Sequence, residues 1–241
     1  MFKKVIQQIL PPAILKIMVF LKNHLHNNFF KKSQLSNHLE CQISPDKQDL
    51  DIYWNSEMAD ILETWGEKTA WNEIKFLMMN CSGKVLDIAC GTGKTIELNS
   101  EFSHIELYGC DISDFLIQKA IERGLSKEKL KVCDATKTPY DDNYFNYSYS
   151  IGSLEHFTED GISEFVAETY RITQFGSFHM IPVSRSCKNE GWLKTLQSFH
   201  NNSVEWWLEK FSSHYSKIYV LDSKWEDNIS VGKWLICLKT R

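Results

Sequence analysis

The chain lacks the cysteine and histidine spacings that mark structural metal sites and disulfide frameworks. Its seven cysteines include no C-x-x-C pair, and no zinc pattern is present. These absences exclude a zinc-ribbon module, and the cysteines lie mainly in predicted apolar segments, which indicates reduced core thiols in a cytosolic protein. We therefore expect no metal. No internal repeat or low-complexity run occurs either, which excludes a repeat architecture.

Acidic side chains are missing from the amino-terminal arm. No Asp or Glu precedes Glu40, whereas six lysines do, so the arm carries +6 and the rest of the chain −10, which sum to the net charge of −4. This negative balance argues against a general nucleic-acid binder, and we expect no nucleic-acid partner. A length of 241 residues fits one α/β domain with an extension.

Long apolar runs are missing as well. Apolar residues recur at helical spacing from Phe2 to Leu10 and again over 14–21, but both stretches are shorter than the roughly 20 residues of a membrane span. No small-residue cleavage site follows, so we expect neither a transmembrane helix nor a signal peptide. Two interpretations of the arm stay open: a helical lid or dimer contact packed on the domain, and a basic segment resting on the inner face of an anionic membrane. Packing is favoured, because amphipathic helices most often cover a core.

The stretch that organises the chain is V-L-D-I-A-C-G-T-G-K, residues 85–94, where an apolar run gives way to small residues. The run from Val85 to Ile88 is typical of a parallel strand that is buried on both faces. Gly91 and Gly93 allow a sharp turn and a close approach of the backbone to a ligand. A helix is expected to begin near Lys94.

Spacing separates three interpretations of this turn. A P-loop requires a glycine five residues before the Gly-Lys-Thr at 93–95, where Ile88 stands. A dinucleotide fingerprint that starts at Gly91 requires a third glycine at the position of Ile96, which weakens this interpretation without excluding it. The remaining pattern, Asp87 followed by a turn of small residues, resembles the first motif of the class I S-adenosylmethionine-dependent methyltransferases, in particular their small-molecule branch.

The resemblance extends over roughly residues 84–182 and implies S-adenosylmethionine as the cofactor. It assigns Asp87 to the methionine end of the cofactor and Gly91 and Gly93 to the nucleoside. Ala89 stands where many members of the family carry another glycine. Asn146, in the approach to the fourth strand, replaces the usual aspartate.

The segments after the glycine turn alternate between strand and helix, which predicts an α/β fold with a doubly wound, Rossmann-like and mostly parallel sheet. Asp111 follows the second strand, 105–110, and its carboxylate can accept hydrogen bonds from both ribose hydroxyls, while Ser113 caps the next helix. The third strand, 130–133, is followed by Asp134, which the resemblance assigns to the adenine amino group of the cofactor. The expected cofactor-binding residues are Asp87, Ala89, Gly91, Gly93, Asp111, Ile112, Asp134, Ala135 and Ile151.

The remaining elements complete the predicted domain. Helices are expected over 53–65 and 70–79, and a helix over 162–172 leads through a turn at Gly176 to strand 178–182. Segments 215–221 and 231–238 predict a final antiparallel hairpin. We thus divide the chain into an extension and linker, 1–50, and a methyltransferase domain, 51–241.

The loop after the fourth strand, 147–151, is expected to face the transferred methyl group, because ligands of open α/β sheets bind at the carboxyl ends of the strands. His156 is the candidate general base for a hydroxyl acceptor, and a structural histidine is the alternative interpretation. Glu155 either binds the cofactor or orients this histidine. Tyr53, Trp54 and Trp192 are candidate pocket residues, and the long connection 184–214 is expected to form part of the acceptor pocket.

The predicted reaction is transfer of a methyl group to a small polar acceptor. The opening M-F-K-K-V-I-Q-Q-I-L-P-P resembles the openings of enzymes of bacterial surface-polysaccharide assembly, which favours O-methylation of a glycan sugar, its precursor or a phosphorylated modification. N-methylation, methylation of a lipid or quinone, and a noncatalytic cofactor-binding scaffold are the alternatives. The Asn/Asp-Pro-Pro-aromatic signature of nucleic-acid amino-methyltransferases is absent after the fourth strand. The expected location is the cytoplasm, with the arm as a contact to a membrane or to a second copy.

Overall fold

The computed structural model describes residues 48–194 and 197–240, all of which belong to the compact unit Pro45–Arg241. The basic arm and the two interpretations of it lie outside the described residues. Within this part of the chain, no helix is long and apolar enough to cross a membrane.

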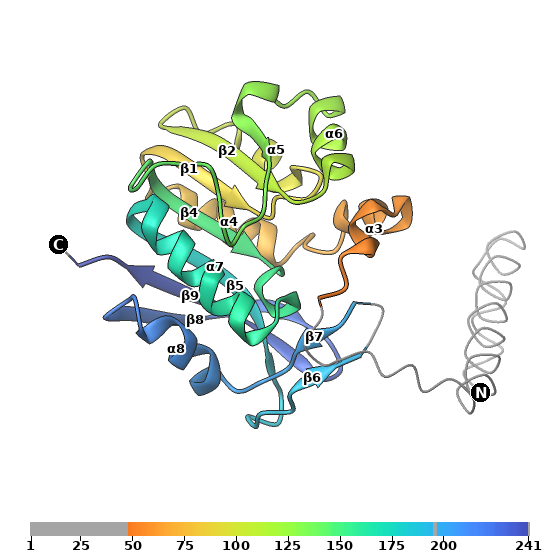
Figure 1. Ribbon diagram of the computed structural model, residues 1–241, viewed down its shortest axis with the longest axis vertical. Helices are drawn as coiled ribbons and strands as arrows, with labels where there is room; N and C mark the ends of the chain where they lie inside the picture. Colours follow the sequence, from red (N-terminus) through yellow and green to blue (C-terminus); the bar gives the residue numbers. More distant parts are fainter. Residues whose placement is uncertain (1–47, 195–196, 241) are drawn as a thin grey trace, which may run out of the picture. The chain divides into compact units, whose positions relative to one another are not determined.

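A seven-stranded sheet forms the centre of the described domain, with the strand order β3-β2-β1-β4-β5-β9-β8 (Figure 1). The first five strands in this order run parallel, and β9 pairs antiparallel with both β5 and β8. A separate antiparallel pair, β6 with β7, lies outside this sheet. The strands are β1 Gly83–Ile88, β2 Ile105–Asp111, β3 Leu130–Val132, β4 Phe145–Ile151, β5 Thr173–Ser184, β6 Trp192–Leu193, β7 Phe199–His200, β8 Lys217–Glu226 and β9 Ser230–Leu238.

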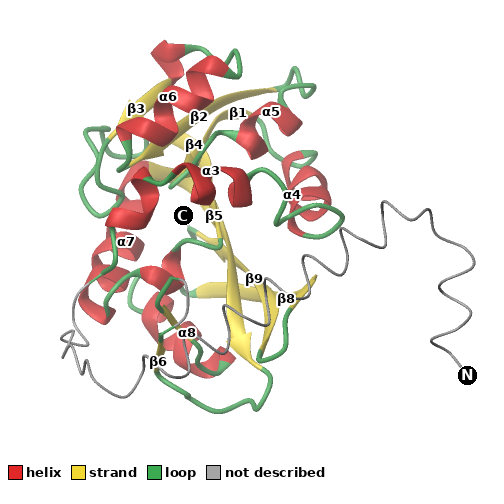
Figure 2. Ribbon diagram, turned by 90° about the vertical axis from the view of Figure 1, so that its right-hand side faces the viewer, coloured by secondary structure: helices red, strands yellow, loops and turns green. Residues whose placement is uncertain are grey.

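Helices cover both faces of the sheet, as Figure 2 shows for α7 and α8 on one side and α4 and α5 on the other. This arrangement, together with the antiparallel edge, confirms the predicted Rossmann-like sheet. The helices are η1 Asp51–Trp54, α3 Ser56–Leu62, α4 Ala70–Met78, α5 Lys94–Asn99, α6 Asp114–Glu122, η2 Lys127–Lys129, η3 Leu154–His156, α7 Glu159–Ile172 and α8 Val204–Ser212.

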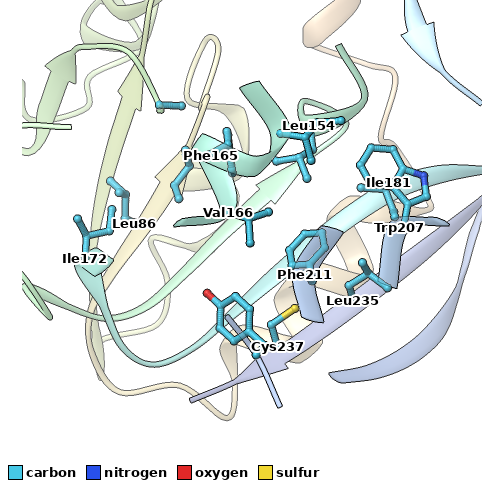
Figure 3. Packing of buried hydrophobic residues seen from close by; sticks show 14 of the residues in the cluster. Leu86, Leu154, Phe165, Val166, Ile172, Ile181, Trp207, Phe211, Leu235 and Cys237 are labelled. Atoms are coloured by element: carbon cyan, nitrogen blue, oxygen red, sulfur yellow. The ribbon is translucent and has the colours of Figure 1, made fainter. Parts of the chain in front are cut away.

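Two apolar clusters hold these layers together, and β1 contributes to both because its successive side chains point to opposite faces. Val85 packs in the cluster under α4 and α5, whereas Leu86 packs in the cluster under α7 and α8. Figure 3 shows the second cluster, to which α7 contributes Phe165 and α8 contributes Trp207 and Phe211. The carboxyl ends of β1, β2 and β4 are thereby fixed side by side.

Three details differ from the sequence-based expectations. Gly176 is not in a turn: α7 passes directly into β5 at Thr173, and a Cβ on Gly176 would lie 2.7 Å from the Cys237 carbonyl oxygen, so the glycine admits β9 instead. The helix expected over 53–65 is divided into η1 and α3, because Asn55 adopts an extended conformation and its side chain caps α3 by accepting from the Glu57 N–H at 2.8 Å. The aromatic residues of 184–214 supply core packing through α8 more than they supply a pocket.

Candidate active site

A cavity of about 330 Å³ opens at the carboxyl ends of the parallel strands. Its walls come from the glycine turn after β1, from the ends of β2 and β4, and from the segment after β3. Residues 48–71, which include η1 and α3, cover the cavity and are called the cover segment. The cavity therefore occupies the position at which open α/β sheets bind their ligands.

The glycine turn forms the floor of the cavity and has the left-handed backbone that its residues predict. Gly91 and Gly93 have φ angles of 54° and 70°, and Ala89 has a φ of 58°, which an alanine adopts only at an energetic cost. This strain explains why a glycine would suit position 89. Helix α5 begins at Lys94, directly after the turn, as predicted.

Asp87 lies at the end of β1 and is only 3% exposed. Its carboxylate accepts a hydrogen bond from the Thr95 hydroxyl, and the Tyr149 hydroxyl in turn donates to the Thr95 hydroxyl oxygen at 3.4 Å. Burial raises the pKa of Asp87 to about 7, against the smaller opposing effect of these hydrogen bonds. A cation bound in the cavity would favour the ionised form of this group.

Asp111 connects β2 to the glycine turn. One carboxylate oxygen accepts from the Gly91 N–H at 2.8 Å and the other from the Ser113 N–H at 2.9 Å, while burial raises the pKa of the carboxyl group. Each oxygen keeps a lone pair for a ligand donor, which fits the predicted contact with two ribose hydroxyls. Ser113 caps α6 by accepting from the Leu116 N–H, as expected.

The segment after β3 and the end of β4 complete the cofactor side. Asp134 is exposed at the cavity, and its Oδ1 accepts from both the N–H and the hydroxyl of Thr136. Ile112, Ala135 and Ile151 also line the cavity. Eight of the nine residues expected to bind the cofactor thus line the cavity, and the ninth, Gly93, lies in the chain between the lining residues Thr92 and Lys94.

Side-chain links hold the cover segment on this floor. Ser113 donates its hydroxyl hydrogen to the Tyr53 carbonyl oxygen at 2.7 Å, and the Trp54 indole N–H donates to Asp114 at 2.7 Å. Arg123 adds a third link, because its guanidinium pairs with Glu63 of the cover and also donates to the Thr92 carbonyl oxygen in the glycine turn at 3.0 Å.

The predicted acceptor residues are only partly brought together. Tyr53 lines the cavity, where its hydroxyl accepts a hydrogen bond from the Gln197 side-chain amide. Burial and the nearby carboxylates raise the pKa of this phenol, so it stays neutral. Trp54 instead lies on the surface, 45% exposed, and Trp192 packs edge-on against His200 with ring centroids 4.6 Å apart. Neither tryptophan contributes to the cavity wall.

His156 is held away from the cavity by the connection 184–214. Its Nδ1–H donates to the Ser198 carbonyl oxygen at 2.8 Å, and its ring lies edge-on to Phe199. Burial lowers the pKa of His156 to about 4, so the ring is neutral. The base role predicted for His156 therefore lacks both the position and the basicity that it requires.

Glu155 is buried beside this histidine, with Oε1 3.7 Å from His156 Nε2. Neither residue lines the cavity, but a Cβ built on the wall residue Gly152 would lie 3.6 Å from Glu155 Oε1. Burial raises the pKa of this carboxyl group to about 8.

Sequence reasoning missed several wall residues. Trp65 and Phe157 belong to segments that were singled out, but their spacing predicts core packing equally well. Gln197 lies in an irregular stretch with no motif, so no signal could have found it. Lys94 also lines the cavity and pairs with Glu97 at 2.8 Å.

Comparisons with known proteins support the methyltransferase fold that the sequence predicts. Residues 85–176 match the family model described as a methyltransferase domain. A mouse protein described as probable tRNA methyltransferase 9B is 33% identical over 120 residues, 48% of this chain and 26% of that protein. The UbiE ubiquinone/menaquinone biosynthesis C-methyltransferase of Burkholderia mallei (strain SAVP1) is 29% identical over 137 residues, 53% of this chain and 54% of that protein.

The chain thus matches between a quarter and about half of the length of these curated relatives. A solved SAM-dependent methyltransferase of Methanosarcina mazei superposes with a TM-score of 0.57 at 17% identity, over 68% of this chain and 95% of that one. The expectation of no nucleic-acid partner gains no support from relatives that include a tRNA methyltransferase. The sheet order and the glycine turn thus agree with the match of residues 85–176 to a methyltransferase-domain model, and the fold resembles that of a solved SAM-dependent methyltransferase.

Proposed function

We propose that the protein transfers the methyl group of S-adenosylmethionine to a small acceptor that enters the cavity beside Tyr53. One observation carries the proposal: a single cavity joins the carboxylates of Asp87, Asp111 and Asp134 to the side chains of Tyr53 and Gln197. The first three groups suit a ligand with a positive charge and ribose hydroxyls, and the last two suit a polar acceptor.

The chain's own residues contribute alignment and exclusion of water. When bound, the cofactor supplies a methyl group on a positively charged sulfur, which is an activated leaving group. The cover segment, which Ser113 and Arg123 fasten to the floor, closes the cavity over the reacting atoms. Tyr53 and Gln197 orient the acceptor so that its nucleophilic atom points at the methyl group.

The acceptor predicted from the sequence was a sugar hydroxyl of a surface glycan or its precursor. The base predicted for that acceptor, His156, is hydrogen-bonded to the Ser198 carbonyl oxygen and does not line the cavity. The cavity's carboxylates also disfavour a phosphorylated acceptor and a polyanion such as tRNA. The site therefore best supports transfer of the methyl group to a neutral or cationic small molecule.

Binding and turnover measurements test the proposal separately. Titration calorimetry should detect S-adenosylmethionine and S-adenosylhomocysteine, and Asp111→Ala should weaken both by about 100-fold or more, because it leaves two buried N–H groups unpaired. Exposed Asp141→Ala is the control and should change neither affinity. Mass spectrometry of acceptor mixtures should then find S-adenosylhomocysteine and a methylated product.

Two results would contradict the proposal. Preferential binding of a nicotinamide dinucleotide would remove the cofactor assignment. Tight cofactor binding with no turnover of amines, hydroxyl compounds, lipids or quinones would favour the alternative of a noncatalytic scaffold.

A further inference from the structure

The ionisable side chains that line the cavity are strongly unbalanced. Among the described residues, five carboxyl groups face one ammonium group, and that ammonium, on Lys94, is already paired with Glu97 at 2.8 Å. An anionic acceptor would lose its hydration without gaining a free positive partner. The five carboxyl groups belong to Asp87, Asp111, Asp134, Asp160 and Glu164.

The amino terminus of α7 does not reverse this balance. Helix amino termini attract anions, but here Glu159 and Asp160 occupy the first turn and Thr158 caps it by accepting from the Gly161 N–H at 3.1 Å. The positive end of the helix dipole is thereby compensated by the chain itself. The cavity mouth beside α7 consequently stays negative.

Glu155 adds a carboxyl group with one oxygen that lacks a hydrogen-bond partner within the described domain. It is 6% exposed, and its Oε2 has no hydrogen-bond partner among the described residues. It lies behind the wall residue Gly152, where a Cβ would come within 3.6 Å of Glu155 Oε1. A buried carboxyl oxygen without a partner is costly unless a ligand supplies the donor.

Aromatic rings surround the same end of the cavity. The Cη2 atom of Trp65 would lie 3.0 Å from a Cβ on Gly152, so this ring and the Glu155 carboxyl group meet at one position in the wall. Tyr53 and Phe157 also line the cavity. Aromatic faces combined with a buried carboxylate are the groups that bind ammonium ions, through cation–π attraction and charge.

From these observations, and on the basis of the proposed function, we infer that the acceptor is a small amine, held as its ammonium ion by Trp65, Tyr53 and the Glu155 carboxylate. An ammonium ion has no free electron pair, so it first gives one proton to Glu155. The amine nitrogen then attacks the methyl carbon and the carbon–sulfur bond breaks, with its electron pair going to sulfur. The products are the methylated ammonium ion and neutral S-adenosylhomocysteine, and Glu155 releases its proton to water.

The groups that face Glu155 are compatible with this proton transfer. His156 Nε2 lies 3.7 Å away and the ring is neutral, because its Nδ1–H is held by the Ser198 carbonyl oxygen. Tyr53 is neutral as well. Burial raises the pKa of Glu155 towards that of an amine, which lowers the cost of the proton transfer.

Binding of simple probes to the full-length protein loaded with S-adenosylhomocysteine tests the inference. The probes are tetramethylammonium chloride, the neutral tert-butanol and the anionic methyl phosphate, each titrated at pH 8.5. Tetramethylammonium should bind at least tenfold more tightly than either other probe. Trp65→Ala and Glu155→Gln should each weaken its binding about fivefold to tenfold.

Controls separate this inference from the proposed function. Glu226→Gln removes an exposed carboxylate that pairs with Arg185 at 2.7 Å outside the cavity, and it should leave probe binding unchanged. Phe157→Leu, a milder change in the wall, serves if Trp65→Ala fails to retain cofactor affinity. Failure to bind S-adenosylhomocysteine would count against the proposed function. Normal cofactor binding with equal binding of the three probes, no binding of any, or a preference for methyl phosphate would overturn the amine assignment alone.

Discussion

The two ends of the cavity are built in different ways. The cofactor end consists of strand termini and one tight turn, within 85–151, and its Asp111 carboxylate accepts from two backbone N–H groups of that same stretch. The acceptor end combines residues from distant segments, such as Tyr53, Gly152 and Gln197. The backbone thus fixes the first end, whereas contacts between side chains fix the second, and substitutions should affect the two ends differently.

The largest effect is expected from Gly93→Ala at the cofactor end. The new Cβ would meet Leu125 Cδ1 at 2.4 Å and Ala120 Cβ at 3.1 Å, with φ at +70°. We expect a loss of about 2–5 kcal/mol in the free energy of unfolding, measured with urea. Gly191→Ala is the matched control, because φ is +79° and nothing lies within 4 Å of its Cβ, so it should cost only the backbone strain. Equal losses in the two variants would show that close packing of the turn is unimportant.

The next largest effect concerns the buried carboxyl group of Asp87. Its pKa rises from 3.8 in the unfolded chain to about 7 in the fold, so the folded state binds the proton more tightly. The contribution of this group to stability is therefore greatest below about pH 4, falls as the pH rises towards 7, and is constant above that. Each pKa unit is worth about 1.4 kcal/mol, so the ligand-free protein should lose on the order of 2–4 kcal/mol between pH 5 and 8.

Asp87→Asn isolates this effect from the other titrating groups near it, Asp111 and Tyr149. Urea unfolding of the variant should show a flatter decline with pH, while Asp134→Asn, at an exposed carboxylate, should follow the parent protein. Identical pH profiles for the parent protein and Asp87→Asn would show that this carboxyl group is not desolvated in the fold.

The same contrast explains what the sequence could predict. The strands, the glycine turn and Asp111 were predictable, because apolar periodicity and positive φ leave local signals. His156 was misplaced because its position depends on the Ser198 carbonyl oxygen, 42 residues away. Trp192 and Trp54 were assigned to the pocket because residue type does not show whether an aromatic ring faces a cavity, a core or a neighbouring helix.

Gly152→Ala should damage the acceptor end alone. The added Cβ would lie 3.0 Å from Trp65 Cη2 at a φ of +63°, so the indole has to move out of the cavity wall. We expect kcat/KM for the acceptor to fall about tenfold, which corresponds to about 1.4 kcal/mol, while the Kd for S-adenosylhomocysteine changes less than twofold. A parallel loss of cofactor affinity would show that the two ends are mechanically coupled.

The smallest effect is expected from Trp54→Phe, which removes one link between the cover and the floor. The indole N–H donates to Asp114 at 2.7 Å, but the side chain is 45% exposed, so its loss should cost only about 0.5–1.5 kcal/mol in closing the cover. Because the cover carries Tyr53, the acceptor KM should rise roughly twofold to tenfold while kcat is nearly constant. Trp192→Phe is the control: it changes the other tryptophan predicted for the pocket, which packs against His200 instead, and it should leave KM unaltered. If both substitutions raised KM equally, the acceptor would have to reach β6, and the acceptor end would extend beyond the cavity described above.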